Sequence, residues 1–439
     1  RFEDPDRALD LMVSRTLDAQ DSLSRAPEWQ QWLADWTMGS NDETRKQAIR
    51  WYRELVETTD DPLSKLRLAI LLGESGQETE ALAETRGWQS RGASALLFGQ
   101  LIEAAYGPQP LERTQEAELQ ASLAEALPSG WFYDHLAARL ARRAGHQDLL
   151  ATVEGQSVLR EDRVQQWIRP LIGFELMCLV IGSVMLLGVV ARLRRQRQGQ
   201  QMDILRFHVP GVPPSWSGGT AAAVILRGGA LGVVTTAVIL STPSFQHASL
   251  RALAIPLANL PLLALAYVHL LKPAGLTFSN GFGLVIKRDH LGRLACIILA
   301  VVAAGLWGEW VMGRAAEFLN LNNHWTEWFD QSLVWGAPPV LAVSALEYVI
   351  FAPIFEELAF RGLLFAMLRR RFEFFPAALI STSLFALAHG YSLIGFISVF
   401  WSGFLWAWIY ERTGSLIPGM VAHAMNNLLV CLTVMALLR

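Results

Sequence analysis

The feature that most constrains the fold is a series of long apolar stretches in the C-terminal two thirds of the chain. A helix needs about 20 mostly apolar residues to cross a bilayer. Eight segments fit that length: 168–190, 219–242, 251–271, 294–313, 336–358, 376–392, 394–411 and 416–438. We therefore predict an all-α protein, with a polytopic transmembrane helix bundle of about eight spans and the lipid bilayer as its surroundings.

Charge separates the chain into two parts. Residues 1–165 hold 28 Asp and Glu against 18 Lys and Arg, whereas residues 166–439 hold 12 against 19. An acidic, water-soluble region followed by a membrane region with basic loops accounts for this balance. We predict three domains: a soluble helical domain at 1–165, first spans and linkers at 166–290, and a further membrane domain at 291–439. Because the basic residues cluster at the ends of apolar segments, a nucleic-acid partner is not expected.

The soluble domain reads as consecutive amphipathic helices, near 5–22, 27–38, 42–58, 62–74, 77–87, 92–105, 111–126, 130–144 and 146–153. Ala69 precedes Gly76 by seven residues, as Ala138 precedes Gly145, which suggests a tetratricopeptide-like repeat. A plain α-helical domain fits equally well. The helical spacing of its tryptophans favours a place in the core over a ligand platform; these are Trp29, Trp32, Trp36 and Trp51.

The basic clusters predict the topology. The first span ends at a group of four arginines, Arg192, Arg194, Arg195 and Arg197, which should be cytoplasmic by the positive-inside bias. The acidic domain would then lie outside, as would loop 314–333, and the domain layout suggests a bacterial inner membrane. The soluble domain contains no cysteine, so no disulfide braces it. The chain begins with Arg1, and we expect a missing N-terminal piece, a signal peptide or a first anchor.

Two glutamates and an arginine interrupt the apolar pattern at the end of segment 336–358. An ionised side chain at the bilayer centre costs roughly 2.5–3.5 kcal/mol. We therefore expect such residues to form ion pairs, to be hydrated in a cavity, or to take part in the function of the protein. Glu357 and Arg361 are i,i+4 neighbours and can form an ion pair. Glu356 is rotated about 100° from that pair, so its carboxylate can point into a cavity and act as a general base on water.

Polar residues in later apolar segments complete a candidate reaction centre. His389 could share or orient the water. His423 and Asn427 are i,i+4 neighbours, so an imidazole and a carboxamide project from one helix face as donors to an oxyanion. Base, water and oxyanion donors together fit amide hydrolysis. Glu175 and Glu347 stand alone in other spans and are interpreted as helix-packing residues.

These residues resemble the motifs of the CAAX-protease and bacteriocin-processing family, also called Abi-type intramembrane peptidases. Its Glu-Glu-x-x-x-Arg motif is Glu356, Glu357 and Arg361, its Phe-x-x-x-His motif is Phe385 and His389, and its His-x-x-x-Asn motif is His423 and Asn427. The resemblance covers about residues 290–439. It implies a membrane-embedded endopeptidase that opens toward the cytoplasm and cuts near the C terminus of a protein substrate or processes small peptides.

The use of a metal is left open by the residues. Glu356, His389 and His423 could hold Zn²⁺ with an open coordination position, in keeping with the family's metalloprotease label. Activation of the water by a carboxylate alone, with no metal, explains the same residues equally well. The alternative function is a non-enzymatic membrane scaffold or bacteriocin-immunity protein, in which the polar cluster ties helices together. On either view, the soluble domain is expected to dock a protein partner or substrate.

Overall fold

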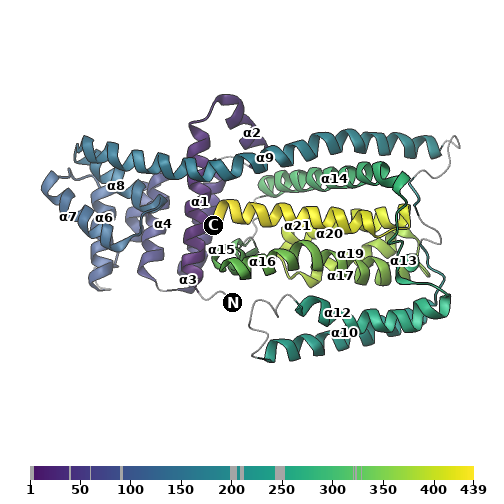
Figure 1. Ribbon diagram of the computed structural model, residues 1–439. Coiled ribbons are helices and arrows are strands. Elements are labelled where there is room, and N and C mark those ends of the chain that lie inside the picture. Colours follow the sequence, from purple (N-terminus) through teal and green to yellow (C-terminus); the bar gives the residue numbers. More distant parts are fainter. Residues whose placement is uncertain are drawn as a thin grey trace. The chain divides into compact units, whose positions relative to one another are not determined.

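The computed structural model describes residues 4–38, 41–59, 61–88, 92–197, 205–207, 212–242, 253–319, 321, 324–327 and 329–439. Every regular element in these residues is a helix, which confirms the all-α prediction (Figure 1). Two compact units divide the chain: the first holds Arg1–Pro170, His324–Phe329 and Ala436–Leu438, and the second holds Leu171–Asn323, Asp330–Met435 and Arg439. The predicted boundary at residue 165 stays a prediction, five residues before this division.

The first unit is built of short helices close to those expected from the sequence: α1 (Pro5–Ser24), α2 (Glu28–Met38), α3 (Asn41–Thr58), α4 (Pro62–Glu74), α5 (Glu78–Glu84), α6 (Ala93–Tyr106), α7 (Arg113–Ala126) and α8 (Trp131–Arg143). Asp61 caps α4 by accepting a hydrogen bond from the Ser64 amide, and Pro62 occupies its first turn. Leu66, Ile70 and Leu72 of α4 are fully buried, so this helix forms the centre of the unit.

The two glycines of the suggested repeat occupy equivalent turns. Gly76 follows α4 with φ 77°, and Gly145 follows α8 with φ 66°. In each case the next residue donates a backbone hydrogen bond to a carbonyl five residues earlier, Gln77 to Leu72 and His146 to Ala141. This is the Schellman ending, in which a left-handed residue favours glycine. The turns match, while the tetratricopeptide assignment stays a prediction.

The prediction of buried tryptophans is wrong for α2. Trp29 is 64% exposed and Trp32 is 66% exposed, while Trp36 and Trp51 are half-buried. Helical spacing places the α2 tryptophans on one face, but spacing alone does not determine whether that face meets the protein core.

The predicted short helix 146–153 and the first span, 168–190, are one helix. α9 runs without interruption from Gln147 to Arg197 and includes Pro170. A proline inside a helix removes one backbone hydrogen bond, and no glycine-rich turn follows to end the helix. The first apolar span thus continues directly from a helix that begins in the acidic region.

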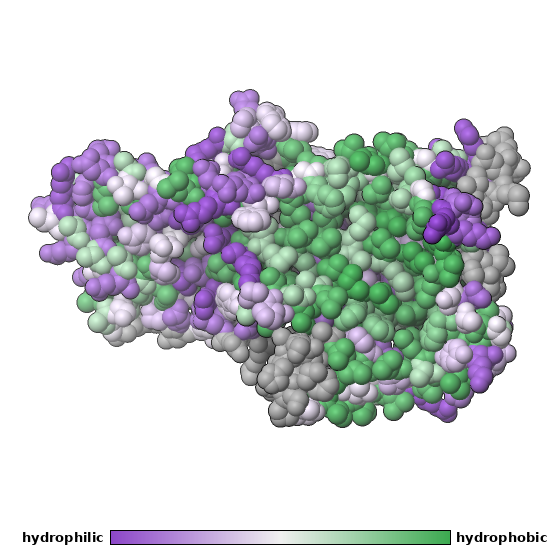
Figure 2. Space-filling view, viewed as in Figure 1, coloured by the Kyte–Doolittle hydropathy of each residue, from purple (hydrophilic) through white to green (hydrophobic). Residues whose placement is uncertain are grey.

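Seven helical stretches in the described residues are long and apolar enough to cross a membrane. They are α9, α10 (Gly218–Ser241), the stretch Ala254–Ala274 that starts with α12 (Ala254–Ala266), the stretch Arg288–Phe318 that contains α14 (Leu291–Phe318), the stretch Pro338–Leu368, α20 (Leu393–Thr413) and α21 (Ile417–Leu438). Figure 2 shows the apolar surface that covers these helices. The second unit is therefore a multi-pass membrane domain.

The predicted span 376–392 differs from the structure. α19 (Phe374–Ala388) has 15 residues, fewer than a full crossing needs, because the chain turns at Gly390 with φ 69°. The start of the predicted span 251–271 and parts of loop 314–333 fall outside the described residues.

Small residues bring α10 and α12 together. A Cβ on Gly228 would lie 2.7 Å from Leu262 Cα, and one on Gly232 would lie 2.8 Å from the Ala258 carbonyl oxygen. Glycines four residues apart allow this close backbone approach between membrane helices. A cavity of about 440 Å³ lies beside the contact.

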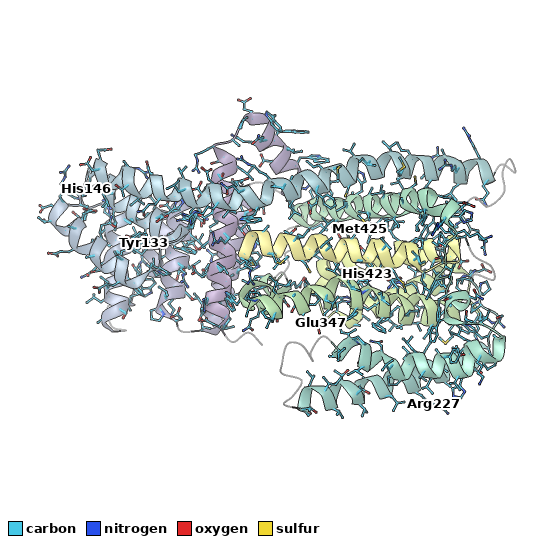
Figure 3. All side chains as sticks on the ribbon, viewed as in Figure 1. Tyr133, His146, Arg227, Glu347, His423 and Met425 are labelled. Atoms are coloured by element: carbon cyan, nitrogen blue, oxygen red, sulfur yellow. The ribbon has the colours of Figure 1, made fainter. Side chains whose placement is uncertain are left out.

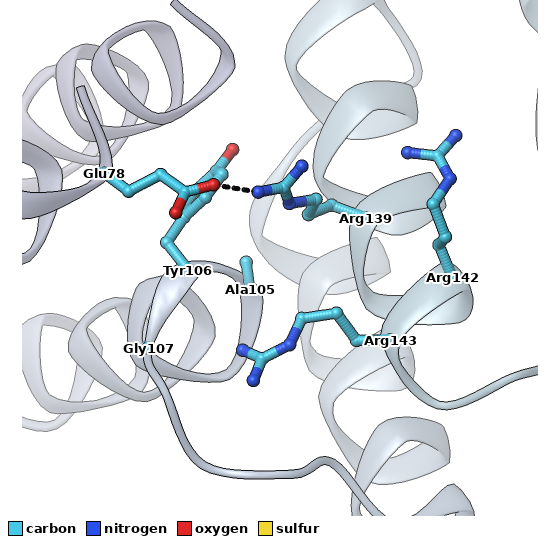
Figure 4. A pocket seen from close by; sticks show the side chains of 7 residues that line it. All are labelled: Glu78, Ala105, Tyr106, Gly107, Arg139, Arg142 and Arg143. Atoms are coloured by element: carbon cyan, nitrogen blue, oxygen red, sulfur yellow. Dashed lines mark hydrogen bonds and ion pairs between the residues drawn. The ribbon is translucent and has the colours of Figure 1, made fainter. Parts of the chain in front are cut away.

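A polar cavity of about 250 Å³ opens between α6 and α8 in the first unit (Figure 4). Its lining residues are Glu78, Ala105, Tyr106, Gly107, Arg139, Arg142 and Arg143. The arginines there already have partners: Arg139 pairs with Glu78, Arg142 pairs with Glu154, and Arg143 donates to backbone carbonyls. The guanidinium groups thus hold the helices together.

A charged cluster in the first unit makes its stability depend on pH. His135 Nε2 lies 3.1 Å from Asp21, and its Nδ1 lies 3.5 Å from Glu74. Burial disfavours the imidazolium, but hydrogen bonds and charge attraction from both carboxylates outweigh it and raise the pKa of His135. Burial opposes the carboxylates too, yet the hydrogen bond and charge of His135 lower the pKa of Asp21 and of Glu74.

We predict that this cluster stabilises the first unit most in the window between its carboxyl and imidazole titrations. The stabilisation that His135 gives the folded state is fully present below about pH 6.5, its ordinary pKa. It is lost as the pH rises through the higher pKa that His135 has in the folded state. The contribution of the carboxylates is complete above about pH 4 and disappears on acidification. Thermal melts of His135→Gln should lack the decline in stability that the unaltered protein shows above neutral pH. An identical decline in both proteins would contradict the assignment.

Candidate functional site

The helix that carries the first motif is widened by two π-helical segments. The stretch Pro338–Leu368 contains α16 (Pro338–Leu346), a π segment at Glu347–Phe351, α17 (Ala352–Glu356), a second π segment at Glu357–Phe365 and α18 (Ala366–Leu368). Segments of π-helix occur often at functional sites, because the extra residue per turn rotates the following side chains. The second segment begins at Glu357, so the motif residues lie where the helical register changes.

Pro353 interrupts the backbone hydrogen-bond pattern that follows the first π segment. The Ala352 amide bonds to the Glu347 carbonyl in the π pattern, so the next donor in that pattern would be residue 353. A proline has no N–H. The Tyr348 carbonyl accepts a hydrogen bond of 2.9 Å from Asn427 Nδ2 on α21.

Glu357 is the buried centre of the motif. Its side chain is 0% exposed, and Oε1 accepts hydrogen bonds from Arg361 Nη1 at 2.9 Å and from His423 Nδ1 at 3.2 Å. The predicted Glu357–Arg361 ion pair is therefore confirmed. The bond to His423 joins residues 66 positions apart and was not predicted. Since an ionised carboxylate only accepts hydrogen bonds, Nδ1 of His423 must carry a proton.

Aromatic rings enclose the charges of this network. Arg361 Cζ lies 4.1 Å from the ring centroid of Phe385 and 5.2 Å from that of Trp406. Trp406 also stacks on His423, with centroids 3.9 Å apart and ring planes 18° from parallel. A guanidinium over an aromatic face gains cation–π stabilisation that increases in a dry setting. The two rings therefore fix Arg361 and orient His423.

Glu356 is the accessible carboxylate of the pair. Its side chain is 32% exposed, and its Oε2 lies 3.7 Å from His423 Nε2. That separation exceeds a hydrogen bond, but a single water can lie at about 2.8 Å from both atoms. His423, labelled on α21 in Figure 3, thus has one nitrogen on the buried Glu357 and the other toward Glu356.

His389 is held apart from the two carboxylates. It follows the end of α19, where its Nδ1 donates a 2.8 Å hydrogen bond to the Phe385 carbonyl. Its ring meets the Phe385 ring edge-on at 4.8 Å, and Phe385 in turn meets His423 edge-on at 6.0 Å. Phe385 thus contacts the rings of both histidines, while the residues that the structure describes form no hydrogen bond with Nε2 of the half-buried His389.

The structure gives the predicted site residues different surroundings. It brings Glu356, Glu357, Arg361 and His423 into one network, whereas Asn427 is tied to Tyr348 and His389 has no direct bond to Glu356. Within the described residues, no group of three His, Cys, Asp or Glu side chains is arranged to hold a metal. Glu356, His389 and His423 therefore do not form a ready Zn²⁺ site here, and their metal role stays a prediction.

Three contributors were missed from the sequence: Trp406, Pro353 and Gly403. A Cβ on Gly403 would overlap Nη2 of Arg361 and lie 2.9 Å from Thr382 Cγ2. Gly403 therefore provides the space in α20 that Arg361 fills. A glycine inside an apolar helix is a signal of close packing, although it does not name the neighbour.

We predict that Gly403→Ala displaces Arg361 and destabilises the membrane domain. Overpacking of this kind costs about 1–3 kcal/mol, and thermal unfolding in detergent should show a lower Tm together with a loss of activity. Gly305→Ala in α14 is the matched control, because a Cβ there would meet no atom within 4 Å. Equal melting of both variants would refute the close contact.

Comparison with known proteins identifies the motif-bearing segment. Residues 338–429 match the family model for "Type II CAAX prenyl endopeptidase Rce1-like". A curated relative from Bacillus subtilis (strain 168), "Putative membrane peptidase YdiL", is 31% identical over 157 residues, or 35% of this chain. The chain spans 60% of that relative's length. No solved structure matches the chain. The segment that holds all three motifs is thus related to the CAAX-type endopeptidases, and the resemblance to the CAAX-protease and bacteriocin-processing family is confirmed.

Proposed function

We propose that this protein is an intramembrane endopeptidase of the CAAX type, with the Glu356–His423–Glu357 network as its reaction centre. The observation that carries the proposal is the asymmetry of the two glutamates. Glu357 is fully buried, and its Oε1 accepts hydrogen bonds from both Arg361 and His423, whereas the side chain of the neighbouring Glu356 is 32% exposed and its Oε2 lies 3.7 Å from His423 Nε2. We therefore assign Glu356 to the reaction itself, and Glu357 to holding Arg361 and His423 in position.

In the proposed reaction, Glu356 removes a proton from a water that also contacts Nε2 of His423. The resulting hydroxide attacks the scissile carbonyl carbon, and a tetrahedral oxyanion forms. Protonated His423, which Glu357 holds at Nδ1, donates a hydrogen bond from its Nε2–H to that oxyanion. Glu356 then returns the proton to the leaving nitrogen, the C–N bond breaks, and a carboxylic acid and an amine are released, which exchange a proton to become a carboxylate and an ammonium group.

His389 and Asn427 receive supporting roles in this proposal. Nε2 of His389, which no protein group occupies, is assigned a contact with the substrate peptide beside the scissile bond. The second N–H of the Asn427 carboxamide can contribute to the oxyanion while the first holds Tyr348. The steps above are written with side chains of this protein and water alone.

The substrate class follows from the family match. We infer a membrane-associated protein or peptide cut near its C terminus, since the matched family model is that of prenyl endopeptidases. The basic clusters at 192–197 and 369–371 are assigned to the cytoplasmic side of an inner membrane, which puts the N-terminal domain outside.

Glu356→Gln tests the general base. We expect its cleavage of an internally quenched, farnesylated CAAX peptide to fall by about 10²–10⁴-fold, with a Tm in detergent close to that of the unaltered protein. Glu175→Gln, which removes a different carboxylate from a membrane helix, should retain activity. A scaffold function predicts the reverse pattern, in which Glu356→Gln lowers the Tm and no variant, including the unaltered protein, cleaves the peptide.

The N-terminal domain is proposed to dock a protein partner or substrate. Deletion of residues 1–160 should leave cleavage of the short farnesylated peptide intact, because every proposed reactive group lies beyond residue 355. Cleavage of full-length protein substrates should become less selective. Unchanged selectivity across a panel of membrane proteins would remove the docking role.

A further inference from the structure

Helix α2 presents an unusual apolar face for a helix of a water-exposed domain. Trp29 and Trp32 are 64% and 66% exposed, and Trp32 stacks on Trp36 with ring centroids 6.4 Å apart and planes 12° from parallel. At 100° per residue these positions lie on one side of the helix. Tryptophan buries a large area when it can, so a face of this kind needs an occupant.

The opposite side of α2 faces the protein. Gln31 Nε2 donates hydrogen bonds to the carbonyls of Ser24, at 2.9 Å, and Ala26, at 2.7 Å. These bonds fix the rotation of α2 against the end of α1, so the tryptophan face is directed outward. The helix contains Glu28 and Asp35 but no lysine or arginine.

Bonds within the first unit join the residues around α2 to the part of α9 that precedes its apolar stretch. Arg25, three residues before α2, forms an ion pair with Glu161 of α9, and Gln165 Nε2 donates a 3.1 Å hydrogen bond to the Ala19 carbonyl. Gln165 precedes Leu171, the start of the apolar span, by about 9 Å along the helix.

Exposed apolar side chains on α9 run from Trp167 onward into the predicted span. Trp167 is 71% exposed and stands two turns before Phe174. Exposed apolar side chains then follow along the helix, namely Phe174, Met177, Val180, Ile181, Val184 and Leu187. A tryptophan directly before a lipid-facing stretch is typical of the membrane–water interface.

We propose that α2 is an interfacial helix whose tryptophan face, Trp29, Trp32 and Trp36, lies in the headgroup region of the bilayer beside Trp167. The exposed Trp167, which directly precedes the apolar stretch of α9, favours lipid over a protein partner. Indole rings suit this region because their apolar body and N–H donor contact both phases. The acidic charges of α2 and its lack of basic residues favour zwitterionic over anionic lipid.

The test uses the full chain, with its native cysteines replaced by alanine, in phosphatidylcholine vesicles. A single cysteine at position 32 (Trp32→Cys) is labelled with an environment-sensitive fluorophore, and spin-labelled lipids carry the quencher either near the headgroup or deep in the acyl chain. Ala124→Cys, on an exposed position of α7, serves as the control. Trp29→Cys provides an independent probe on the same face should the first variant fold poorly.

The proposal predicts strong quenching at positions 29 and 32 by the shallow quencher, weaker quenching by the deep one, and none at position 124. Quenching at 29 and 32 no greater than at 124 would overturn it, since the face would then be free or reserved for a protein. Stronger quenching by the deep label would also overturn it, because the helix would be inserted among the acyl chains.

Discussion

A charged guanidinium buried inside a membrane domain is the constraint on which the candidate site depends. Arg361 is 2% exposed and lies in an apolar bundle, where an unpaired charge would cost several kcal/mol. Its partners come from separate helices: Glu357 on its own helix, Phe385 on α19 and Trp406 on α20. The contacts of the Arg361 guanidinium therefore hold three helices together at a single point.

That arrangement also explains why two adjacent glutamates have different surroundings. The carboxylate that neutralises Arg361 has no exposed surface and accepts a second hydrogen bond from His423. Glu356, one residue earlier, is turned out of that contact and keeps a third of its side chain accessible. We thus assign stability to Glu357 and chemistry to Glu356, because the helix directs these two neighbouring glutamates into different environments.

The sequence predicted the local parts of this site and not the contacts between distant segments. The Glu357–Arg361 pair follows from i,i+4 spacing and needs no tertiary information. The choice of Glu357 as the partner of His423 depends on helix rotation, which the π segments alter in a way that periodicity does not reveal. His389 was expected to share the water of Glu356, but the end of α19 binds its Nδ1 to a backbone carbonyl. The exposed faces of Trp29 and Trp32 were missed because helical spacing identifies a face without identifying its neighbour.

The bond between Asn427 and the Tyr348 carbonyl has a consequence for the depth of the reaction centre. Asn427 is one turn from His423 on the same helix, and its acceptor is the Tyr348 carbonyl in the helix that carries both glutamates. A slip of α21 by one turn, about 5.4 Å, would break this bond and carry the imidazole away from both glutamates. This hydrogen bond therefore fixes the position of α21 along its axis, so that His423 stays level with Glu356 and Glu357.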